Sequence, residues 1–347
     1  MKILFANTIF PEGHKLIDSR YIYALSKIGE VTVVAPKKWY MELPESVKII
    51  EYAACHEETL GKEAKGRKAF YGASMRHICH IKSVLSSEQY DYVVVGAFDL
   101  VTFPGALLWN KRAKIIVMHH NNIDQLENSW IKRLIFNIYK KKVVHVVLEK
   151  YIKEYLCKQY NLEDNNVYVW LHPVWEKELT KEKEYDCVGI SNSNDEELVY
   201  KIIEKEKINE DVKKSGLKII LRSRSSSFDN GYLKVITGWL DRKTYEDYIS
   251  KAKVVYVPFS KSFHYRVSGS IIDAFSNGIP IVGTNCPLVD YYSEQYHSIC
   301  ETYCESTFLE AILRLSQCSE EQKCEFKKFQ SERSILAIIE MIKGDLE

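Results

Sequence analysis

Short runs of Val and Ile, almost uninterrupted, alternate with longer segments of helical pattern along nearly the whole chain. In the first half these runs include Val31–Ala35, Tyr92–Gly96, Lys114–Met118 and Val143–Leu148. Continuous apolar residues, rather than alternating ones, are what a parallel strand buried on both faces requires. Because parallel strands need crossover connections, which are right-handed, the pattern predicts an α/β fold with a doubly wound sheet.

The same pattern starts again in the second half, with strand-like runs at Tyr185–Ile190, Leu217–Leu221 and Val254–Pro258. Residues 176–184, just before them, are highly charged and lack periodicity, which is typical of a domain boundary. A chain of 347 residues is also too long for one ordinary core. We therefore predict two tandem Rossmann-like domains, 1–175 and 176–347, with a cleft between them. The helical pattern over Glu320–Lys343 makes the last helix a candidate to cross back to the first domain.

Charge and composition exclude several classes of protein. Lys and Arg total 48 against 47 Asp and Glu, and no nucleic-acid-binding motif is present, so we expect no nucleic-acid partner. No run of about 18 apolar residues occurs, and the start MKILFANTIF fits a first strand better than a signal peptide. Nine scattered Cys without a C-x-x-C pair indicate reduced thiols rather than a metal site. These features predict a cytoplasmic protein without a bound metal.

In this kind of fold, ligands bind beyond the carboxyl ends of the strands, so the residues that follow each strand decide function. After the first strand, Gly13 stands alone where a dinucleotide site would have G-x-G-x-x-G, and no P-loop motif occurs. Gly13 either allows close approach of a substrate to the backbone or only shapes a turn. After Lys114–Met118 comes His119-His120-Asn121-Asn122. A His at this position can serve as a hydrogen-bond donor or an acid–base group near neutral pH.

Arginines and hydroxyl side chains follow a strand of the second half. Arg222 and Arg224 lie within Arg222–Ser227, directly after Leu217–Leu221. Two guanidinium groups among several hydroxyls suit a diphosphate, with a solvated loop as the alternative.

The stronger signal is the loop that follows Val254–Pro258. Arg266 comes shortly before the expected start of a helix, and Asp273 falls in the second turn of that helix. Free N–H groups at the helix start, together with Arg266, make a phosphate clamp, and Asp273 can accept hydrogen bonds from a ribose. An ordinary capped helix is the alternative. The residues at the helix start are Ser268, Gly269 and Ser270.

Several segments, in the right order along most of the chain, resemble the GT-B glycosyltransferases, in particular the retaining group called family four. Tyr265–Gly283 is similar to the C-terminal signature E-G-F-G-L-x-x-x-E-A-M-A-x-G-x-P-V-V-A. Val235–Leu240 and Tyr245–Ala252 resemble the "F-x-G-x-V … L-x-x-x-Y-x-x-A-D" segment. Val144–Tyr155 resembles "A-D-x-V-I-x-x-S-x-x-x-K-x-x-L", and Val167–Val174 resembles the "V-I-P-N-G-V" that ends the first domain.

The resemblance implies a transferase that takes a sugar from a nucleoside-diphosphate sugar, with UDP or GDP as the nucleotide. The second domain would hold the donor and the first the acceptor, and no metal or other cofactor would be essential. Asp273 matches the second Glu of the family's E-x7-E motif, which contacts the ribose. Trp239 and Leu240 fall where the base is held, and His120 falls near the active-site His.

Two further positions follow from the same resemblance. Gly13 falls in the loop that closes on the donor phosphate. His14, directly after Gly13, is a candidate base if the reaction inverts the sugar configuration.

Two departures from the family pattern indicate a divergent member. Tyr265 stands where the first Glu of E-x7-E would lie, and Val188–Glu196 lacks the usual Arg and Lys. The donor phosphate would then depend on Arg222, Arg224 and Arg266. A nucleotide-sugar epimerase, and a non-catalytic GT-B-like subunit that supports a partner transferase, remain as alternatives.

Basic residues gather in the first half, which carries 24 basic and 18 acidic side chains. Residues 61–82 have a net charge of +5, and Lys132, Arg133 and 140–142 add cations beside Trp130 and Ile131. Cations beside exposed aromatic residues suit an anionic membrane surface, with a solvated charged face as the alternative. We therefore expect a glycan or lipid-linked acceptor in surface polysaccharide or glycoconjugate assembly, and a peripheral position at the inner face of the membrane.

Overall fold

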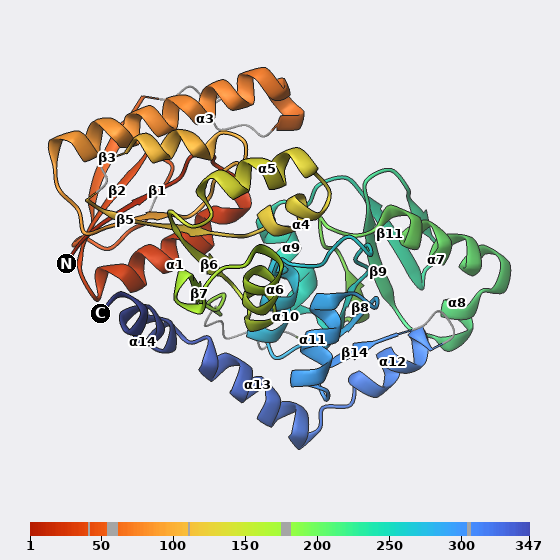
Figure 1. The fold of residues 1–347 in the computed structure, drawn as a ribbon. Coiled ribbons are helices and arrows are strands. Elements are labelled where there is room, and N and C mark those ends of the chain that lie inside the picture. The colour runs from red at the N-terminus through yellow and green to blue at the C-terminus, as the bar shows by residue number, and fades with distance from the viewer. Residues whose placement is uncertain (41, 54–61, 110–111, 175–181, 304–306) are drawn as a thin grey trace. The chain divides into compact units, whose positions relative to one another are not determined.

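The computed structural model describes residues 1–40, 42–53, 62–109, 112–174, 182–303 and 307–347, with the side chains of 62–65 excluded. The chain divides into two compact units (Figure 1). Unit 1 comprises Met1–Pro173 together with Ser334–Glu347, and unit 2 comprises Val174–Arg333. In each unit a seven-stranded sheet forms the centre.

The sheet of unit 1 is parallel throughout, in the order β3-β2-β1-β4-β5-β6-β7. Ile3 lies opposite Val31 on one side and Tyr92 on the other, so β1 is central and the chain changes direction between β1 and β4. The strands are β1 (Lys2–Ala6), β2 (Glu30–Pro36), β3 (Lys48–Tyr52), β4 (Tyr92–Val95), β5 (Lys114–Met118), β6 (Val144–Val147) and β7 (Val167–Val169).

Unit 1 includes the last helix of the chain. That helix packs against α1, and Asp345 on it accepts a hydrogen bond from Trp170 Nε1 at 2.9 Å. Tyr92 Oη donates to the Leu346 carbonyl at 2.7 Å. The helical elements of unit 1 are η1 (Glu12–His14), α1 (Lys15–Ser26), α3 (Lys62–Ser87), η2 (Phe103–Leu108), α4 (Asn122–Glu127), α5 (Trp130–Tyr139), α6 (Lys150–Tyr160), η3 (Asp164–Asn166) and α14 (Ile335–Leu346).

Unit 2 has the strand order β10-β11-β9-β8-β12-β13-β14, parallel except for the β10–β11 pair. Its chain changes direction between β8 and β12. The strands are β8 (Tyr185–Gly189), β9 (Ile219–Ser223), β10 (Phe228–Asp229), β11 (Leu233–Thr237), β12 (Ala252–Val257), β13 (Ile281–Gly283) and β14 (Cys300–Thr302). The helices are α7 (Glu196–Asn209), α8 (Asp211–Ser215), α9 (Arg242–Ser250), α10 (Gly269–Ser276), α11 (Pro287–Gln295), α12 (Phe308–Leu315) and α13 (Glu320–Glu332).

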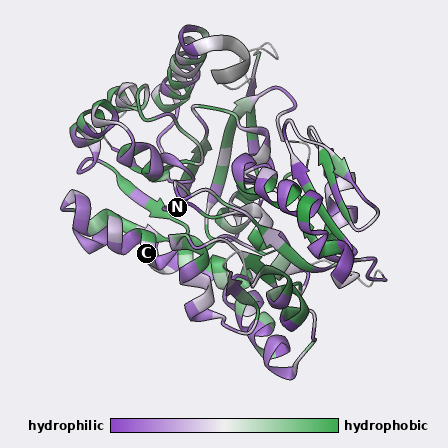
Figure 2. Cartoon of the chain, turned by 90° about the vertical axis from the view of Figure 1, so that its right-hand side faces the viewer, coloured by the Kyte–Doolittle hydropathy of each residue, from purple (hydrophilic) through white to green (hydrophobic). Residues whose placement is uncertain are grey.

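Both sheets are buried on their two faces, which explains why the strands read as continuous apolar runs. Ile3–Phe5 and Val93–Val95 are fully buried in unit 1, as are Val254 and Tyr256 in unit 2. Figure 2 shows strands that are mostly hydrophobic and helices that combine hydrophobic and hydrophilic turns. The prediction of two Rossmann-like α/β domains is therefore confirmed.

The helix expected over Glu320–Lys343 is two helices, α13 and α14, so that expectation was wrong in its extent. The helix breaks at Arg333, and Ser334 Oγ accepts a hydrogen bond from the Ala337 N–H at the start of α14. A side chain that caps a helix start favours a new helix over the continuation of the old one. The break coincides with the return of the chain to unit 1.

Candidate functional site

A pocket of about 410 Å³ lies beyond the carboxyl ends of the unit 1 strands, where the strand order changes direction. The loops after β1, β4 and β5 line it, together with residues of α3, α4 and α5. Such a crevice is the usual ligand site of an open parallel sheet. Among the residues that line the pocket are Phe70, Asp99, Gln125 and Lys132, together with the two histidines His14 and His120.

The structure brings the two histidines predicted from the sequence together in this pocket. The ring centroids of His14 and His120 are 4.0 Å apart, although the residues are far apart in sequence. His120 Nε2 lies 2.9 Å from the Gly96 carbonyl. A carbonyl only accepts, so Nε2 carries the proton in this pair, and Nδ1 of a neutral His120 keeps its lone pair. Nδ1 of His14 is buried and has no hydrogen-bond partner among the described residues.

Burial keeps both rings neutral at physiological pH. Burial lowers the pKa of His120 to about 4, against a smaller opposing effect of the hydrogen bond to Gly96. The pKa of His14 is also well below its ordinary value, first because of burial and then because of the nearby His120 and His172. A neutral imidazole with a free lone pair can accept a proton from a substrate hydroxyl.

A buried polar network supports the loop that carries His14 and the strand end that bonds His120. Asn7 Nδ2 donates to Asp18 Oδ2 at 2.7 Å, and Tyr40 Oη donates to the same oxygen at 3.0 Å. Asn7 Oδ1 accepts from the Ala97 N–H at 2.8 Å. Burial raises the pKa of Asp18 to about 7.

Gly96 is required by close packing in this network. A Cβ at Gly96 would lie 2.6 Å from Phe5 Cζ and 2.7 Å from Asn7 Oδ1. Sequence reasoning missed Asn7, Asp18, Tyr40 and Gly96. The one available signal was the position of Asp18 on α1, one helical turn after His14.

The other predicted residues of these loops fall in different surroundings. His119 is buried, and its Nε2 lies 2.9 Å from His145 Nδ1, so it belongs to the core. Gly13 lies in η1, and a Cβ there would meet no atom within 4 Å. Neither the backbone nor close packing of the protein therefore requires a glycine at position 13.

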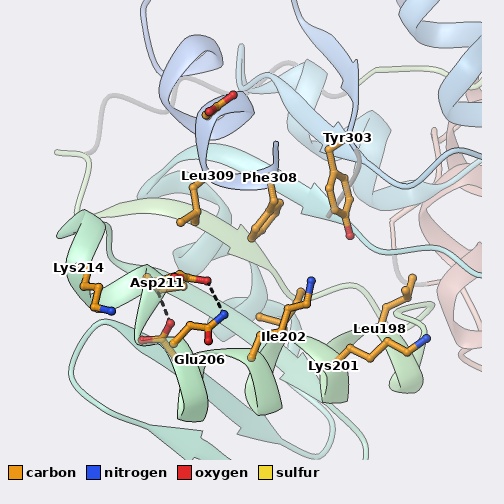
Figure 3. A pocket seen from close by; sticks show the side chains of 13 residues that line it. Leu198, Lys201, Ile202, Glu206, Asp211, Lys214, Tyr303, Phe308 and Leu309 are labelled. Carbon is orange, nitrogen blue, oxygen red and sulfur yellow. Dashed lines mark hydrogen bonds between the residues drawn. The ribbon is translucent and has the colours of Figure 1, made fainter. Parts of the chain in front are cut away.

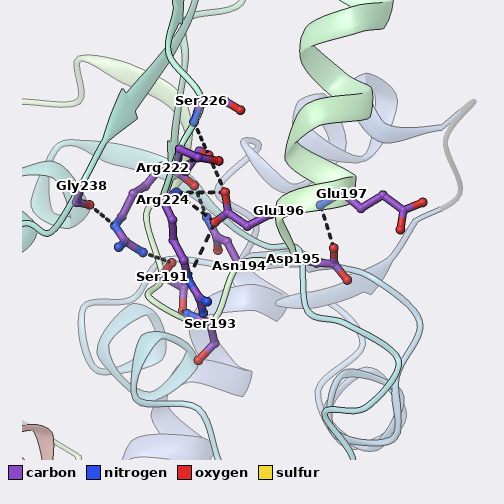
Figure 4. A network of polar contacts seen from close by, with 12 residues as sticks. Ser191, Ser193, Asn194, Asp195, Glu196, Glu197, Arg222, Arg224, Ser226 and Gly238 are labelled. Carbon is purple, nitrogen blue, oxygen red and sulfur yellow. Dashed lines mark hydrogen bonds and ion pairs between the residues drawn. The ribbon is translucent and has the colours of Figure 1, made fainter. Parts of the chain in front are cut away.

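In unit 2, the loops after β8 and β12 bond to each other where the strand order changes direction. The Asp195 N–H donates to the Pro258 carbonyl at 2.7 Å, and Asn194 pairs with Phe259 in an isolated bridge. Asn194 Nδ2 also donates to the carbonyl of Arg222, near the end of β9, at 2.9 Å, which connects β9 to these loops (Figure 4).

Arg222 holds these loops together with its own side chain. It is fully buried, with Nε donating to the Gly238 carbonyl and Nη1 donating to the Ser191 carbonyl at 3.3 Å. Its guanidinium also lies 5.1 Å from the ring centroid of Trp239. The structure thus places Arg222 behind Trp239 as a support, whereas the sequence suggested a direct phosphate ligand.

Arg224 extends into solvent, next to an acidic residue that the sequence analysis did not select. Its backbone N–H donates to both carboxylate oxygens of Glu196, at 3.0 and 2.9 Å, and its Nε lies 4.0 Å from Glu196 Oε1. Ser223 Oγ donates to the same carboxylate.

The start of α10 is open, in contrast to the start of α7. The Asp195 side chain accepts hydrogen bonds from the N–H groups of Glu197 and Leu198, so the N-terminus of α7 is already occupied by a carboxylate. At α10 the N-cap residue is Ser268, whose side chain makes no capping hydrogen bond. A Cβ at Gly269, the first residue of α10, would meet nothing within 4 Å. An open helix N-terminus beyond a strand end attracts anions.

Side chains that could bind a nucleotide surround this helix start. The Arg266 guanidinium lies 4.0 Å from the ring centroid of Phe263. Asp273 is buried, and its Oδ1 lies 3.6 Å from Arg242 Nη2. The Tyr245 hydroxyl bonds to the side chains of Ser270 and Asp273. Arg242 and Tyr245 were not selected from the sequence.

Three further predicted residues of unit 2 are accessible to different degrees. Trp239 leaves 77% of its surface exposed. Leu240 and Tyr265 are partly exposed. An exposed indole ring backed by a buried arginine is a suitable surface for stacking of a base.

A larger cavity of about 800 Å³ lies elsewhere in unit 2 and contains none of the predicted site residues (Figure 3). Apolar side chains such as Ile202 and Phe308 form much of its wall. Glu206, also in the wall, accepts hydrogen bonds from the N–H groups of Val212 and Lys213, which gives it a structural role in α8.

No protein-family model matches the sequence, and no curated protein matches it either. Many solved structures do match the fold. Sucrose-phosphate synthase from Thermosynechococcus elongatus aligns over 99% of this chain and 98% of its own, with a TM-score of 0.68 and 10% identity. The lipopolysaccharide outer core galactosyltransferase WaaB aligns over 100% and 99%, with a TM-score of 0.62 and 11% identity. Arabidopsis thaliana UGT89C1 in complex with UDP aligns over 99% of both chains, with a TM-score of 0.60 and 12% identity.

These likenesses span both units and establish that the chain has the GT-B fold. At this level of identity they establish the fold alone, because one fold carries many activities. The activity therefore depends on the residues beyond the carboxyl ends of the strands: the pocket of His14 and His120 in unit 1 and the start of α10 in unit 2.

Proposed function

We propose that the protein is a glycosyltransferase that moves a sugar from a UDP- or GDP-linked donor to a glycan or lipid-linked acceptor. The observation that carries this proposal is the N-terminus of α10, which has no side-chain cap and follows β12, one of the two strands between which the unit 2 strand order changes direction. UGT89C1, which has the same fold, was solved in complex with UDP. The proposal assigns the donor to unit 2 and the acceptor to unit 1.

In unit 2, the proposed chemistry is stabilisation of the leaving diphosphate. Negative charge develops on the diphosphate as the bond to the sugar breaks, and fixed N–H groups and cations lower the free energy of that state. The first N–H groups of α10 and the Arg266 guanidinium supply this positive potential. We infer that these groups serve in place of a metal, so that the reaction needs no cofactor. Trp239 would stack on the base, and Asp273 would accept a hydrogen bond from the ribose.

In unit 1, the proposed chemistry is activation of the acceptor. An acceptor hydroxyl in the pocket of about 410 Å³ would lie beside two neutral imidazoles. We assign uptake of the hydroxyl proton to the unprotonated Nδ1 of His120, which makes the oxygen a better nucleophile, with His14 as the alternative base. Lys132, on the wall of the same pocket, can bind an anionic group of the acceptor. We place this activity in the cytoplasm, in the assembly of surface polysaccharide or glycoconjugate.

Calorimetric titration of the full chain with UDP, GDP, CMP and dTDP, without metal, tests the donor site. We expect selective binding of one nucleotide in the micromolar range, about −7 to −8 kcal/mol. Arg266→Ala should weaken that binding at least about tenfold, since a charge-assisted contact contributes about 1.5–3 kcal/mol. Lys327→Ala, which removes an exposed cation on α13, serves as the matched control and should bind like the wild type.

Two results would contradict the donor site. Unchanged affinity in Arg266→Ala would remove Arg266 from it. Failure of all four nucleotides to bind would reject the proposal in favour of a non-catalytic subunit of the same fold.

A further inference from the structure

Helix α5 exposes a row of large apolar side chains on unit 1. Exposed fractions are 68% for Trp130, 50% for Ile131, 59% for Leu134 and 52% for Ile138. At 3.6 residues per turn these four positions fall within one stripe along the helix. We call this stripe the α5 face. The opposite side of α5 is buried in unit 1 through Phe136 and Tyr139, so the α5 face is additional to the side that holds the helix in place.

The apolar surface continues beyond α5. Leu108 at the end of η2 is 68% exposed, and η2 packs against both α5 and α3. Monomeric proteins rarely expose contiguous apolar patches of this kind without a binding partner. The α5 face therefore calls for an apolar partner surface.

The segments that carry this surface are basic, although Glu127 lies at the end of α4, just before α5. From Trp130 to Leu148 the sequence contains five basic residues and no acidic one, and from Gly66 to Ser87 it contains four basic residues and no acidic one. Lys141 and Lys142, directly after α5, are exposed. An apolar stripe bordered by cations is complementary to an anionic bilayer, in which acyl chains receive the apolar side chains and headgroups receive the cations.

The length of α5 suits a helix that lies on a bilayer surface and does not cross it. Among the described residues, no helix is long and apolar enough to cross a bilayer. Ten residues of α5 extend about 15 Å, at 1.5 Å per residue. Such a helix fits at the boundary between headgroups and acyl chains, lying along the membrane plane.

We propose that unit 1 binds an anionic lipid bilayer through the α5 face, with the basic side chains of α5, its C-terminal extension and α3 on the headgroups. Lys132 lies on the same helix and also lines the pocket of His14 and His120, and Phe70 of α3 lines it as well. Membrane contact through α5 thus holds this pocket at the lipid–water boundary, which is where a lipid-linked acceptor presents its headgroup. The bilayer contact itself does not depend on the proposed sugar transfer.

Co-sedimentation of the full chain with vesicles tests the proposal. We compare phosphatidylcholine vesicles with vesicles of phosphatidylcholine and phosphatidylglycerol at 7:3, at low and high salt. We expect binding to the anionic vesicles that weakens as salt screens the charges. Ile131→Ser combined with Leu134→Ser should reduce the partition coefficient at least about tenfold, because each change removes an inserted apolar side chain. Lys141→Gln combined with Lys142→Gln should reduce binding and flatten its salt dependence.

Ile208→Ser combined with Leu336→Ser is the matched control, because these residues are 80% and 72% exposed but lie on α7 and α14. It should bind vesicles like the wild type. The proposal is overturned if the wild type does not bind anionic vesicles, or if the control loses as much binding as the α5 variant. It is also overturned if the α5 changes convert a dimer to a monomer in light scattering, since the α5 face would then bind a second copy. Nucleotide titration of the same variants is a separate readout, so failure of the donor site and failure of the membrane contact are distinguishable.

Discussion

The two units share one architecture but differ in the chemistry at the carboxyl ends of their strands. Where the strand order of unit 1 changes direction, two neutral, half-buried histidines line a pocket of about 410 Å³. At the corresponding place in unit 2, the N-terminus of α10 has no side-chain cap, and Arg242 Nη2 lies 3.6 Å from Asp273 Oδ1 on that helix. The first arrangement suits removal of a proton, and the second suits binding of an anion. Because the sheets are so alike, the difference comes from the loops that follow the strands.

The largest effect should come from removing the basic nitrogen in unit 1. In His120→Gln the amide can still donate to the Gly96 carbonyl, but the side chain can no longer take up a proton. Sugar transfer should fall about 10²–10⁴-fold, with nucleotide affinity unchanged, when rate and binding are measured separately. His297→Gln, at an exposed site of unit 2, is the control. A variant that lost nucleotide binding together with activity would break the division of roles between the units.

The next effect is a pH dependence of the free energy of unfolding that arises from Asp18 in unit 1. The folded protein holds the Asp18 proton up to about pH 7, whereas an unfolded Asp has a pKa near 3.8, so the folded state binds more protons between these values. The free energy of unfolding should therefore fall as pH rises from about 4 to about 7, by up to roughly 4 kcal/mol. Asp18→Asn should remove this slope in urea titrations.

Asp229→Asn, at an exposed position of unit 2, should keep the slope of the wild type and serves as the control. A slope unaffected by Asp18→Asn would show that Asp18 is already ionised in the fold.

A smaller effect is expected from a methyl group at Gly96. The added Cβ would overlap Phe5 and Asn7, and overpacking of this kind costs about 1–3 kcal/mol. Gly96→Ala should lower the urea midpoint of unit 1, whereas Gly13→Ala has free space and should leave it nearly unchanged. Equal destabilisation by the two variants would mean that the Asn7 network does not restrict position 96.

Sequence patterns predicted the fold more completely than the sites. Buried parallel strands leave a direct signature in runs such as Val93–Val95, so both sheets could be anticipated. His120 was recognised from its place after a strand, but its pairing with His14 needed the crossing of two loops in three dimensions. Tyr40 gave no signal and Asp18 only its position one helical turn after His14, because a polar residue on a helix or loop usually faces water and only the packing shows that these side chains bond to each other.

Arg222 shows that the sequence also failed to predict the hydrogen-bond partners of a site residue. Its position after β9 suggested a phosphate ligand, yet its donors bond to the carbonyls of Gly238 and Ser191. The acceptors come from loops distant in sequence, and a main-chain carbonyl is present at every residue, so no residue type marks it. The sequence could show where a cation lies but could not show which oxygen it binds.

The place of α14 in unit 1 has a consequence for synthesis of the protein. Unit 2 is continuous from Val174 to Arg333, whereas unit 1 needs Ser334–Glu347 to cover α1 and to accept the hydrogen bond from Trp170. On the ribosome, unit 2 can therefore complete its fold while the first 173 residues still lack their last helix. Until then the apolar side of α1 that α14 covers stays open to water, so the part of the chain made first is the part that matures last.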